Sequence, residues 1–459
     1  MRPSTPLPAL AAEIARLAAP AIVQGLLHTA VLFTDRLLLG RFSPDALASM
    51  QISGPLLWSV FSVCGAMGAG IVAVVGRAVG AGQVELARRT VSASLAFAGG
   101  VGLLVGLLGF LLREPIALGM GGAGEPAVQA MALTYMGWLF AATPLQVLGA
   151  AAMTALQAGG DTRTPMRVSV VAGVLNLVLS YGLLFGAWGL PALGVAGSAI
   201  GSVAAFALHA LVLLGLLRRR GGPVSLGPPY RPLLPALRPV LKVSLPTLGE
   251  KLVFHSGFLV FAGLVGQLGP VAMAANQSLI AIESLGFIAA AGFGVASGSL
   301  VARRLGADQP EEAARVGWVA SALGMSALGL VSLLFLLLPE LLVGAFTTDP
   351  EVIATGADCL RVAALAQPLM ALADTLASSL RAAGDTRSPL RIALVGPVFV
   401  RLIACVLLAF VLDMGLLGIW IGTTIDWAVR CLALVVVWSR GRWVQAFSPA
   451  HSPETGPGR

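Results

Sequence analysis

The chain has 459 residues, of which 57% are hydrophobic and only 11% are charged, and its mean hydropathy is +0.90. A soluble globular protein carries about 25% charged residues, so this chain could not cover a water-exposed surface with polar groups. The net charge of +8 does not indicate a nucleic-acid partner, because the arginines lie in short segments between apolar runs, where they set membrane topology. Composition therefore predicts a polytopic membrane protein and excludes a nucleic-acid-binding one.

Apolar runs of about 20 residues predict twelve transmembrane helices. The first six expected spans cover residues 14–39, 46–76, 89–112, 126–156, 164–187 and 193–217. The second six cover residues 239–266, 272–302, 314–338, 350–380, 389–412 and 416–438. Hydrocarbon offers no water to satisfy backbone groups, and no segment alternates with a period of two, so we expect an all-α fold. The first span is too long for the apolar part of a signal peptide, and we expect it to stay in the protein.

The four cysteines all lie in apolar runs without metal-ligand spacing. We interpret them as small core residues and expect neither a disulfide nor a zinc site. They are Cys64, Cys359, Cys405 and Cys431.

Arginine predicts the orientation of these spans. One alternate set of loops holds most of the arginines, among them Arg77, Arg88, Arg163, Arg218, Arg303, Arg315, Arg387 and Arg440. Loops rich in arginine stay on the cytoplasmic side of a membrane. We therefore expect both termini to be cytoplasmic, with the protein in the inner (plasma) membrane of the cell.

The chain also contains an internal repeat. An offset of 226 pairs Pro20 with Pro246 and Gly40 with Gly266, and an offset of 224 pairs the segments Gly160–Pro165 and Gly384–Pro389. Six spans in each half give both halves the same orientation, so we expect two lobes related by an axis along the membrane normal. The expected boundaries are residues 1–217 for the first lobe, 218–238 for a basic, proline-rich linker, 239–440 for the second lobe and 441–459 for a tail. In the paired loops, Asp161 and Asp385 are expected to cap the helices that follow.

These features together resemble the multidrug and toxic compound extrusion (MATE) family. The resemblance rests on two six-helix halves, the stretch Thr34-Asp-Arg-Leu-Leu-Leu-Gly40, the twin Gly-Asp-Thr-Arg-x-Pro loops and the phrase Val171-Ala-Gly-Val-Leu-Asn176. It covers nearly the whole chain. It implies an exporter of hydrophobic, often cationic organic compounds, driven by a proton or sodium gradient, with alternating access of two lobes.

Asp35 is the candidate on which this function depends. It is the acid within the apolar stretch 20–40, and the resemblance implies that it binds the coupling cation. A carboxylate in hydrocarbon costs roughly 2.5–3.5 kcal/mol on insertion scales, and burial disfavours its charged form, so it could take up and release a proton. The alternative is an acid at the helix end that is neutralised by Arg36 or Arg41. The echo of this stretch in the second half places Phe261 at the matching position, so the acid belongs to one lobe only.

The fifth span offers partners for this acid. Some relatives carry Asn-x3-Asp there, whereas this chain has Asn176 and Ser180. We expect both side chains to join Asp35 in the cation site. The alternative for Asn176 is a helix–helix hydrogen bond.

The second half carries more acids. Glu250, Glu283 and Asp374 are candidates for a second cation site, at positions that match the family pattern loosely. The alternative is ion pairing within the lobe: Glu250 with Lys251, Asp426 with Arg430, or either acid with Arg401. For Asp426 we favour the ion pair.

Polar, aromatic and thioether side chains within the spans could line a substrate cavity through dispersion and cation–π contacts. The candidates are Gln24, His28, Tyr135, Trp138, Met153, Tyr181, His255 and Met370. Each is also a plausible core or interface residue, and a lone histidine in a helix is more often a packing residue than a ligand.

No nucleophile–base pair and no metal cluster can be recognised, so we expect no enzyme activity, no metal and no cofactor beyond the coupling ion. The expected partners are small-molecule substrates and the lipid bilayer, with the protein as a monomer. A flippase for lipid-linked saccharides is the nearest alternative function, and a channel or membrane scaffold is a more distant one. A flippase predicts a more cationic central groove than this sequence offers.

Overall fold

The structure is a computed structural model, and it describes residues 5–119, 125–219, 221–222, 224–227 and 233–445. Most of the expected linker is covered, but residues 220, 223 and 228–232 and most of the expected tail lie outside the described residues. Among the described residues, twelve helical spans are long and apolar enough to cross a membrane, which confirms the predicted number and the all-α class. Because these spans are helical, each one satisfies its backbone polar groups with hydrogen bonds inside the span.

The first half contains α1 (Leu7–Phe42), α2 (Pro44–Cys64), α3 (Met67–Gly80), α4 (Val84–Gly119), α5 (Pro126–Ala158), α6 (Arg163–Phe185), η1 (Ala187–Gly189) and α7 (Val195–Arg219). The second half contains α8 (Leu234–Gly266), α9 (Pro270–Gly306), α10 (Pro310–Leu337), α11 (Pro339–Gly344), α12 (Pro350–Ala383), α13 (Arg387–Leu394), η2 (Val395–Arg401), α14 (Leu402–Val406), η3 (Leu407–Val411), α15 (Gly415–Ser439) and η4 (Arg442–Gln445).

The second span differs from the expectation of one continuous helix. It breaks at a turn over Gly65 and Ala66, between α2 and α3, whereas its counterpart α9 continues unbroken. The eleventh span also departs from regular α-helix, since η2 and η3 are π-helical. Pro397 lies in η2 and cannot donate a backbone hydrogen bond, which favours such a local change of pitch.

Capping by the twin loops is confirmed. The Asp161 carboxylate accepts a hydrogen bond from the backbone N–H of Thr164 at 2.9 Å, and Asp385 accepts one from the N–H of Ser388 at 3.1 Å. Each contact satisfies a donor in the first turn of the next helix. The repeated loops therefore repeat a local structure.

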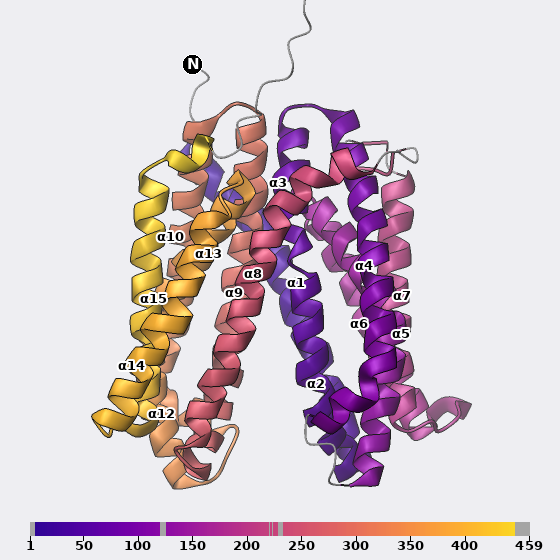
Figure 1. The fold of residues 1–459 in the computed structure, drawn as a ribbon, viewed down its shortest axis with the longest axis vertical. Helices are drawn as coiled ribbons and strands as arrows, with labels where there is room; N and C mark the ends of the chain where they lie inside the picture. The colour runs from indigo at the N-terminus through magenta and orange to yellow at the C-terminus, as the bar shows by residue number, and fades with distance from the viewer. Residues whose placement is uncertain (1–4, 120–124, 220, 223, 228–232, 446–459) are drawn as a thin grey trace, which may run out of the picture.

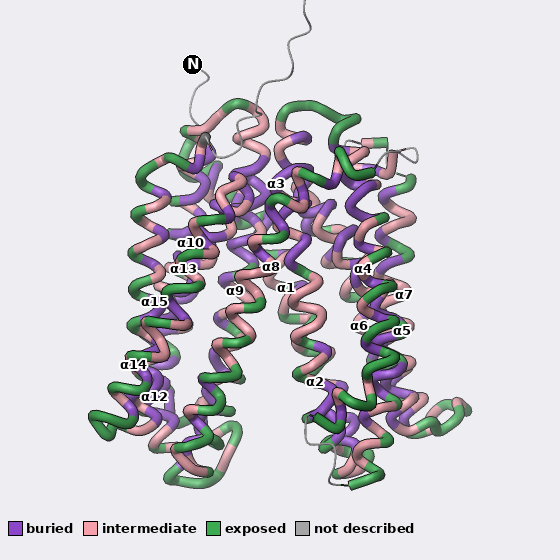
Figure 2. Tube along the Cα trace, in the orientation of Figure 1, coloured by how far each residue is buried: buried purple, intermediate pink, exposed green. Residues whose placement is uncertain are grey.

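The helices form two bundles that approach each other at one end and diverge towards the other (Figure 1). The converging end carries the start of α1, the ends of α3 and α9 with Arg77 and Arg303 in their last turns, and the starts of α6 and α13 at Arg163 and Arg387. We call it the arginine-rich end. Long exposed apolar side chains, such as Leu103, cover the outer faces, which appear largely as exposed or intermediate positions in Figure 2. Such an apolar belt suits contact with lipid.

Two helices cross from one bundle to the other. In α1, the side chains of Leu10 and Ile14 are buried with α9, α12 and α15 of the second bundle, whereas Leu38 lies in the core of the first. In α8 the pattern is reversed, because Val240 packs with α3, α4 and α5 of the first bundle and Phe261 lies in the core of the second. Pro20 and Pro246, which the repeat pairs, lie inside these two helices between the two packed segments.

Glycine allows α3 and α9 to meet closely at the arginine-rich end. A Cβ atom on Gly80 would clash with the backbone of Arg303, and one on Gly306 would clash with the backbone of Arg77. Nearby, the Ser299 hydroxyl of α9 donates a hydrogen bond of 2.7 Å to a main-chain carbonyl at the end of α5. We call the contacts of Gly80, Gly306, Arg77, Arg303 and Ser299 the lobe seal.

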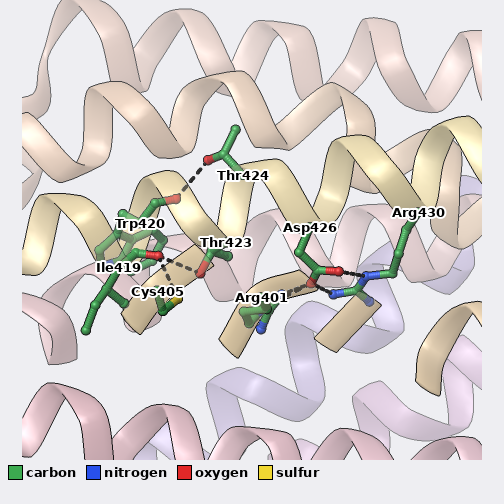
Figure 3. A network of polar contacts seen from close by, with 8 residues as sticks. All are labelled: Arg401, Cys405, Ile419, Trp420, Thr423, Thr424, Asp426 and Arg430. Carbon is green, nitrogen blue, oxygen red and sulfur yellow. Dashed lines mark hydrogen bonds and ion pairs between the residues drawn. The ribbon is translucent and has the colours of Figure 1, made fainter. Parts of the chain in front are cut away.

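A buried ion cluster fixes the irregular eleventh span to α15 (Figure 3). Asp426 is 0% exposed, and its carboxylate accepts hydrogen bonds of 2.9 Å from Nε of Arg401 and from Nε of Arg430. The guanidinium of Arg430 also stacks on the ring of Trp427, with its central carbon 4.1 Å from the ring centroid. The expected ion-paired role of Asp426 is confirmed.

The lobe seal generates a first prediction. Changing Gly80 to Val should force the seal apart, because the new side chain would meet main-chain atoms that cannot rotate away. In a protein without its native cysteines, an added Ala158→Cys reporter, buried beside the seal, should then react with a maleimide much faster than it does with Gly80 present. Gly306→Val should have the same effect.

The matched control is Gly100→Val, because a Cβ atom on Gly100 in α4 would meet open space. Equal reporter reactivity in the Gly80 and Gly100 variants would show that the close approach of α3 and α9 does not hold the arginine-rich end shut.

The ion cluster generates a second prediction. Changing Asp426 to Ala should lower the free energy of unfolding by about 3–5 kcal/mol, because it leaves two buried guanidinium groups without their carboxylate. Chemical unfolding of the purified protein in detergent measures the loss. Asp358→Ala, which removes an exposed partner of Arg361, should have little effect, and a similar loss in both variants would contradict the role of the cluster.

Candidate functional site

Asp35 lies on the face of α1 that packs inside the first bundle, and its side chain is buried, with the residue 3% exposed. The hydroxyl of Ser202, on α7, donates a hydrogen bond of 3.2 Å to Oδ2 of Asp35. The amide nitrogen of Asn176, on α6, donates a hydrogen bond of 3.0 Å to that same hydroxyl. Side chains of α6 and α7 thus bring neutral hydrogen-bond donors to the carboxylate on α1.

Ser180 completes this group on α6. Its hydroxyl donates a hydrogen bond of 3.3 Å to the main-chain carbonyl of Ser198, and Asn176 and Ser180 both lie close enough to interact with the Asp35 carboxylate. Gly201 makes the packing possible, because a Cβ atom there would clash with Ser180. The structure therefore brings together Asp35, Asn176 and Ser180, as the sequence predicts.

Ser202 is a member of this site that sequence reasoning missed. It stands in a span of small residues near Gly197 and Gly201, where a serine resembles any other packing residue. The only signal that could have found it is its place one residue after the glycine that admits Ser180.

The Asp35 carboxylate has no ion-pair partner within the described part of the chain, so pairing with Arg36 or Arg41 does not occur. Its Oδ1 atom, the Oδ1 atom of Asn176 and the hydroxyl of Ser198 are buried without a hydrogen-bond partner. A buried acceptor without a donor is costly, so this oxygen-rich group is suited to a proton or a small cation. No group of three His, Cys, Asp or Glu side chains among the described residues could hold a metal ion by itself.

A second polar group lies in the same bundle nearer the arginine-rich end. The side-chain amide of Gln157 donates a hydrogen bond of 3.2 Å to Oε1 of Gln24, whose own amide donates one of 3.1 Å to the hydroxyl of Ser169. Met153 also contacts the Gln24 amide through its sulfur, and the Ser169 hydroxyl lies 3.3 Å from Nε2 of His209. We call Gln24, Gln157, Ser169 and His209, with His28 beside them, the inner polar layer.

The second bundle carries an ion pair at the positions equivalent to Gln24 and Gln157. The repeat offsets match Gln24 to Glu250 and Gln157 to Arg381. The guanidinium of Arg381 donates a hydrogen bond of 2.9 Å to the Glu250 carboxylate. Glu250 is therefore paired with Arg381 and not, as one alternative had it, with the adjacent Lys251.

Asp374 and Glu283 lie in different surroundings. The half-buried Asp374 interacts electrostatically with Arg381, Arg430 and Lys251. Glu283 is 8% exposed, has an unpartnered Oε1 atom and interacts electrostatically with Arg401. The three candidate acids of the second lobe therefore do not form one site: two belong to a mixed-charge cluster and the third lies beside the Asp426 cluster.

The candidate cavity residues are dispersed. Tyr135 is buried in the core near Asp35, and Met370 is 0% exposed in the core of the second bundle. Trp138 borders a groove between α4 and α5, away from the second bundle. Tyr181 is exposed near the end of α6, where its ring makes tilted contacts with the rings of Phe185 and Trp188.

His255 is different, because it links the two bundles. Its Nδ1 atom lies 3.4 Å from the hydroxyl of Ser59 on α2, and its ring makes an edge contact with Trp58, with 4.7 Å between ring centroids. His28 is exposed on α1. These two histidines and Gln24 are the predicted cavity residues that lie on the helices crossing between the bundles.

Comparisons with known proteins agree with this architecture. A family model described as MatE matches residues 20–182 and again residues 246–407, once in each half. The chain is 32% identical over 447 residues to the probable multidrug resistance protein NorM of Pseudomonas putida, with 94% of each protein covered. It is 29% identical over 444 residues to the probable multidrug resistance protein NorM of Thermotoga maritima, with 96% of this chain and 95% of that protein covered.

Solved structures share the fold. A mutant of the MATE transporter VcmN of Vibrio cholerae matches with a TM-score of 0.88 at 20% identity, covering 96% of this chain and 99% of that one. A MOP superfamily transporter from Pyrococcus furiosus matches with a TM-score of 0.85 at 19% identity, covering 95% and 96% of the two chains. With two matches to the family model that together span both lobes, the chain belongs to the MatE family of multidrug and toxic compound extrusion transporters, a family of membrane transporters and not of enzymes.

Proposed function

We propose that this transporter is a cation-coupled antiporter that exports hydrophobic, often cationic organic compounds, driven by a proton or sodium gradient. The observation that carries the proposal is the buried Asp35 carboxylate, which is held by neutral donors and has no ion pair within the described residues. Such a carboxylate can gain or lose a cation without breaking a salt bridge. The multidrug resistance proteins that the chain resembles support the class of substrate.

We further propose that the arginine-rich end faces the cytoplasm of a bacterial inner membrane, with both termini on that side, and that the protein works as a monomer. The concentration of arginine in these loops supports this orientation. The lobe seal then closes the cytoplasmic side, and the bundles diverge towards the outside (Figure 1).

Alternating access follows from competition at Asp35. A cation that enters from the outside neutralises the carboxylate and lowers the affinity for a positively charged substrate, which leaves. Release of the cation on the cytoplasmic side restores the charge and lets the next substrate bind. The coupling requires that cation and substrate favour different conformations, because a ligand with equal affinity for both shifts neither.

The second-lobe acids contribute in two ways in this proposal. Glu250 and Asp374 lie in a cluster that already contains Lys251 and Arg381, so they are structural partners of those cations. Glu283 keeps an unpartnered carboxylate oxygen and is the second-lobe candidate for a coupling cation.

A flippase for lipid-linked saccharides is the alternative that the buried arginines of the second bundle could favour. Each of Arg381, Arg401 and Arg430 is paired with a carboxylate, however, so together they offer little free positive charge to a lipid diphosphate. Export of organic cations is therefore the better supported function.

The test of this proposal is transport by Asp35→Asn. In everted membrane vesicles an exporter carries its substrate inward, and an imposed proton or sodium gradient drives this uptake. In the Asp35→Asn variant the uptake should fall to the level measured without a gradient, because an amide cannot exchange a cation. A fluorescent organic cation reports the flux. Glu351→Gln, at an exposed acid near the start of α12, is the control and should transport normally. Gradient-driven transport that survives in the Asp35 variant would rule out the proposed role of this carboxylate.

Ser202→Ala distinguishes the two coupling ions. The Ser202 hydroxyl donates a hydrogen bond to the Asp35 carboxylate, and losing this bond destabilises the charged form by about 0.5–1.5 kcal/mol. The ion concentration that gives half-maximal transport should therefore change by up to about tenfold. If protons drive transport, this concentration should fall; if sodium does, it should rise, since the ion loses a nearby oxygen. Ser326→Ala, an exposed serine bonded within α10, is the control. Identical curves for both variants would remove Ser202 from the site.

A further inference from the structure

The inner polar layer forms a directed chain of hydrogen bonds. Gln157 donates to Gln24, and Gln24 donates to the hydroxyl oxygen of Ser169. The hydrogen of that hydroxyl is then available to Nε2 of His209, 3.3 Å away. When the Ser169 hydroxyl donates to Nε2, that nitrogen is the acceptor at the end of the hydrogen-bond chain, and the imidazole is the neutral tautomer with its hydrogen on Nδ1.

The layer repeats the pattern of the Asp35 site two helical turns away. On α1, α6 and α7 the members are spaced by seven residues: His28 and Asp35, Ser169 and Asn176, and Ser202 and His209. Seven residues return a helix to nearly the same face after about 10.5 Å. The same three helix faces thus carry one polar group around Asp35 and a second one nearer the arginine-rich end.

The surroundings of His209 contain one other titratable group. His28 on α1 acts on it electrostatically, and within the described residues no acid does so. From α5 it faces Gly149, where a Cβ atom would lie 2.9 Å from Nδ1, and from α6 it faces Ser169. Two neighbouring imidazolium ions repel each other, so the pair is built to hold one proton.

The hydrogen-bond chain also reaches the lobe seal. Its first member, Gln157, offers its main-chain carbonyl to the Ser299 hydroxyl of the second bundle at 2.7 Å. Opening the seal breaks this main-chain contact at the residue whose side-chain amide begins the hydrogen-bond chain. At the other end of the hydrogen-bond chain, protonation of His209 turns Nε2 from an acceptor into a donor. Nε2 can then no longer accept the hydrogen of the Ser169 hydroxyl.

We propose that His209 and His28 form a second proton-binding site of the first lobe, empty while the lobe seal is closed and able to fill when the seal opens. The inference rests on the proposed proton coupling at Asp35 and adds a station between that carboxylate and the arginine-rich end. The proton leaves the Asp35 carboxyl as the carboxylate forms, crosses the two helical turns on water molecules, and binds an imidazole nitrogen. The imidazolium then returns it to water at the arginine-rich end.

Nitrogen NMR of the imidazoles tests the site directly, because the chain has only four histidines and single substitutions assign them. The full-length protein, labelled at histidine and held in lipid nanodiscs, is titrated between pH 5 and 8. With the seal intact, His209 should keep an unprotonated Nε2 across this range. With Gly80→Val, or with Gly306→Val if the first variant does not fold, the same nitrogen should become protonated within the range.

Two further variants establish the site. In the seal-opened protein, His28→Gln or Ser169→Ala should shift the His209 midpoint by more than about 0.3 pH unit, since the first removes the neighbouring imidazole and the second the hydroxyl that contacts Nε2. The control is His255→Gln, because His255 lies on α8 and contacts Ser59 of α2. This change should leave the His209 midpoint unchanged. An unprotonated His209 in both seal states, or a midpoint that ignores His28 and Ser169, would overturn the proposal.

Transport then separates this inference from the function on which it rests. His209→Gln should slow proton-driven uptake severalfold while leaving equilibrium binding of the fluorescent cation unchanged, whereas Asp35→Asn removes the coupling itself. Absence of proton-driven transport in the wild type would contradict proton coupling at Asp35. The histidine site is decided separately by the NMR titration, which needs no transport.

Discussion

The cost of burying a charge in a low-dielectric interior is the constraint on which this structure depends, and the two bundles meet it differently. The second bundle pairs its deepest acid with two guanidinium groups, since Asp426 lies between Arg401 and Arg430. The first bundle buries Asp35 among hydroxyl and amide groups that carry no charge. A carboxylate between two cations cannot bind another cation without breaking ion pairs, whereas one held by neutral donors has no ion pair to break.

This difference gives the crossing helices their significance. α1 carries Asp35 in the first bundle, while its opening turns, with Leu10 and Ile14, are part of the core of the second. A change of charge at Asp35 therefore acts on a helix that packs in the cores of both bundles. α8 makes the reciprocal crossing, so each bundle holds the first turns of a helix from the other. The lobe seal lies where these helices and α3 and α9 meet.

The sequence was sufficient for the features that depend on composition and repetition. Hydropathy predicted twelve spans, the repeated loops predicted their capping aspartates, and family resemblance placed Asn176 and Ser180 beside Asp35. Features that depend on which face a helix turns towards its neighbour were missed. Ser202 is a serine among small residues, and the fully buried Met370 is indistinguishable by spacing from a cavity-lining one. The crossing of α1 and α8 was also invisible, because apolar residues look the same whichever core they enter.

The pairs Gln24–Gln157 and Glu250–Arg381 show how one duplicated position has acquired two kinds of chemistry. Both join the helix that crosses between the bundles to its neighbour, one turn beyond the proline that the repeat conserves. In the second lobe the guanidinium only donates, so both hydrogen bonds run outward from Arg381, one to Glu250 and one to the hydroxyl of Ser378, each of 2.9 Å. An amide both donates and accepts, so the glutamine pair can continue into Ser169 and His209. The hydrogen-bond chain of the first lobe therefore exists because its repeat position carries amides where the second lobe carries charges.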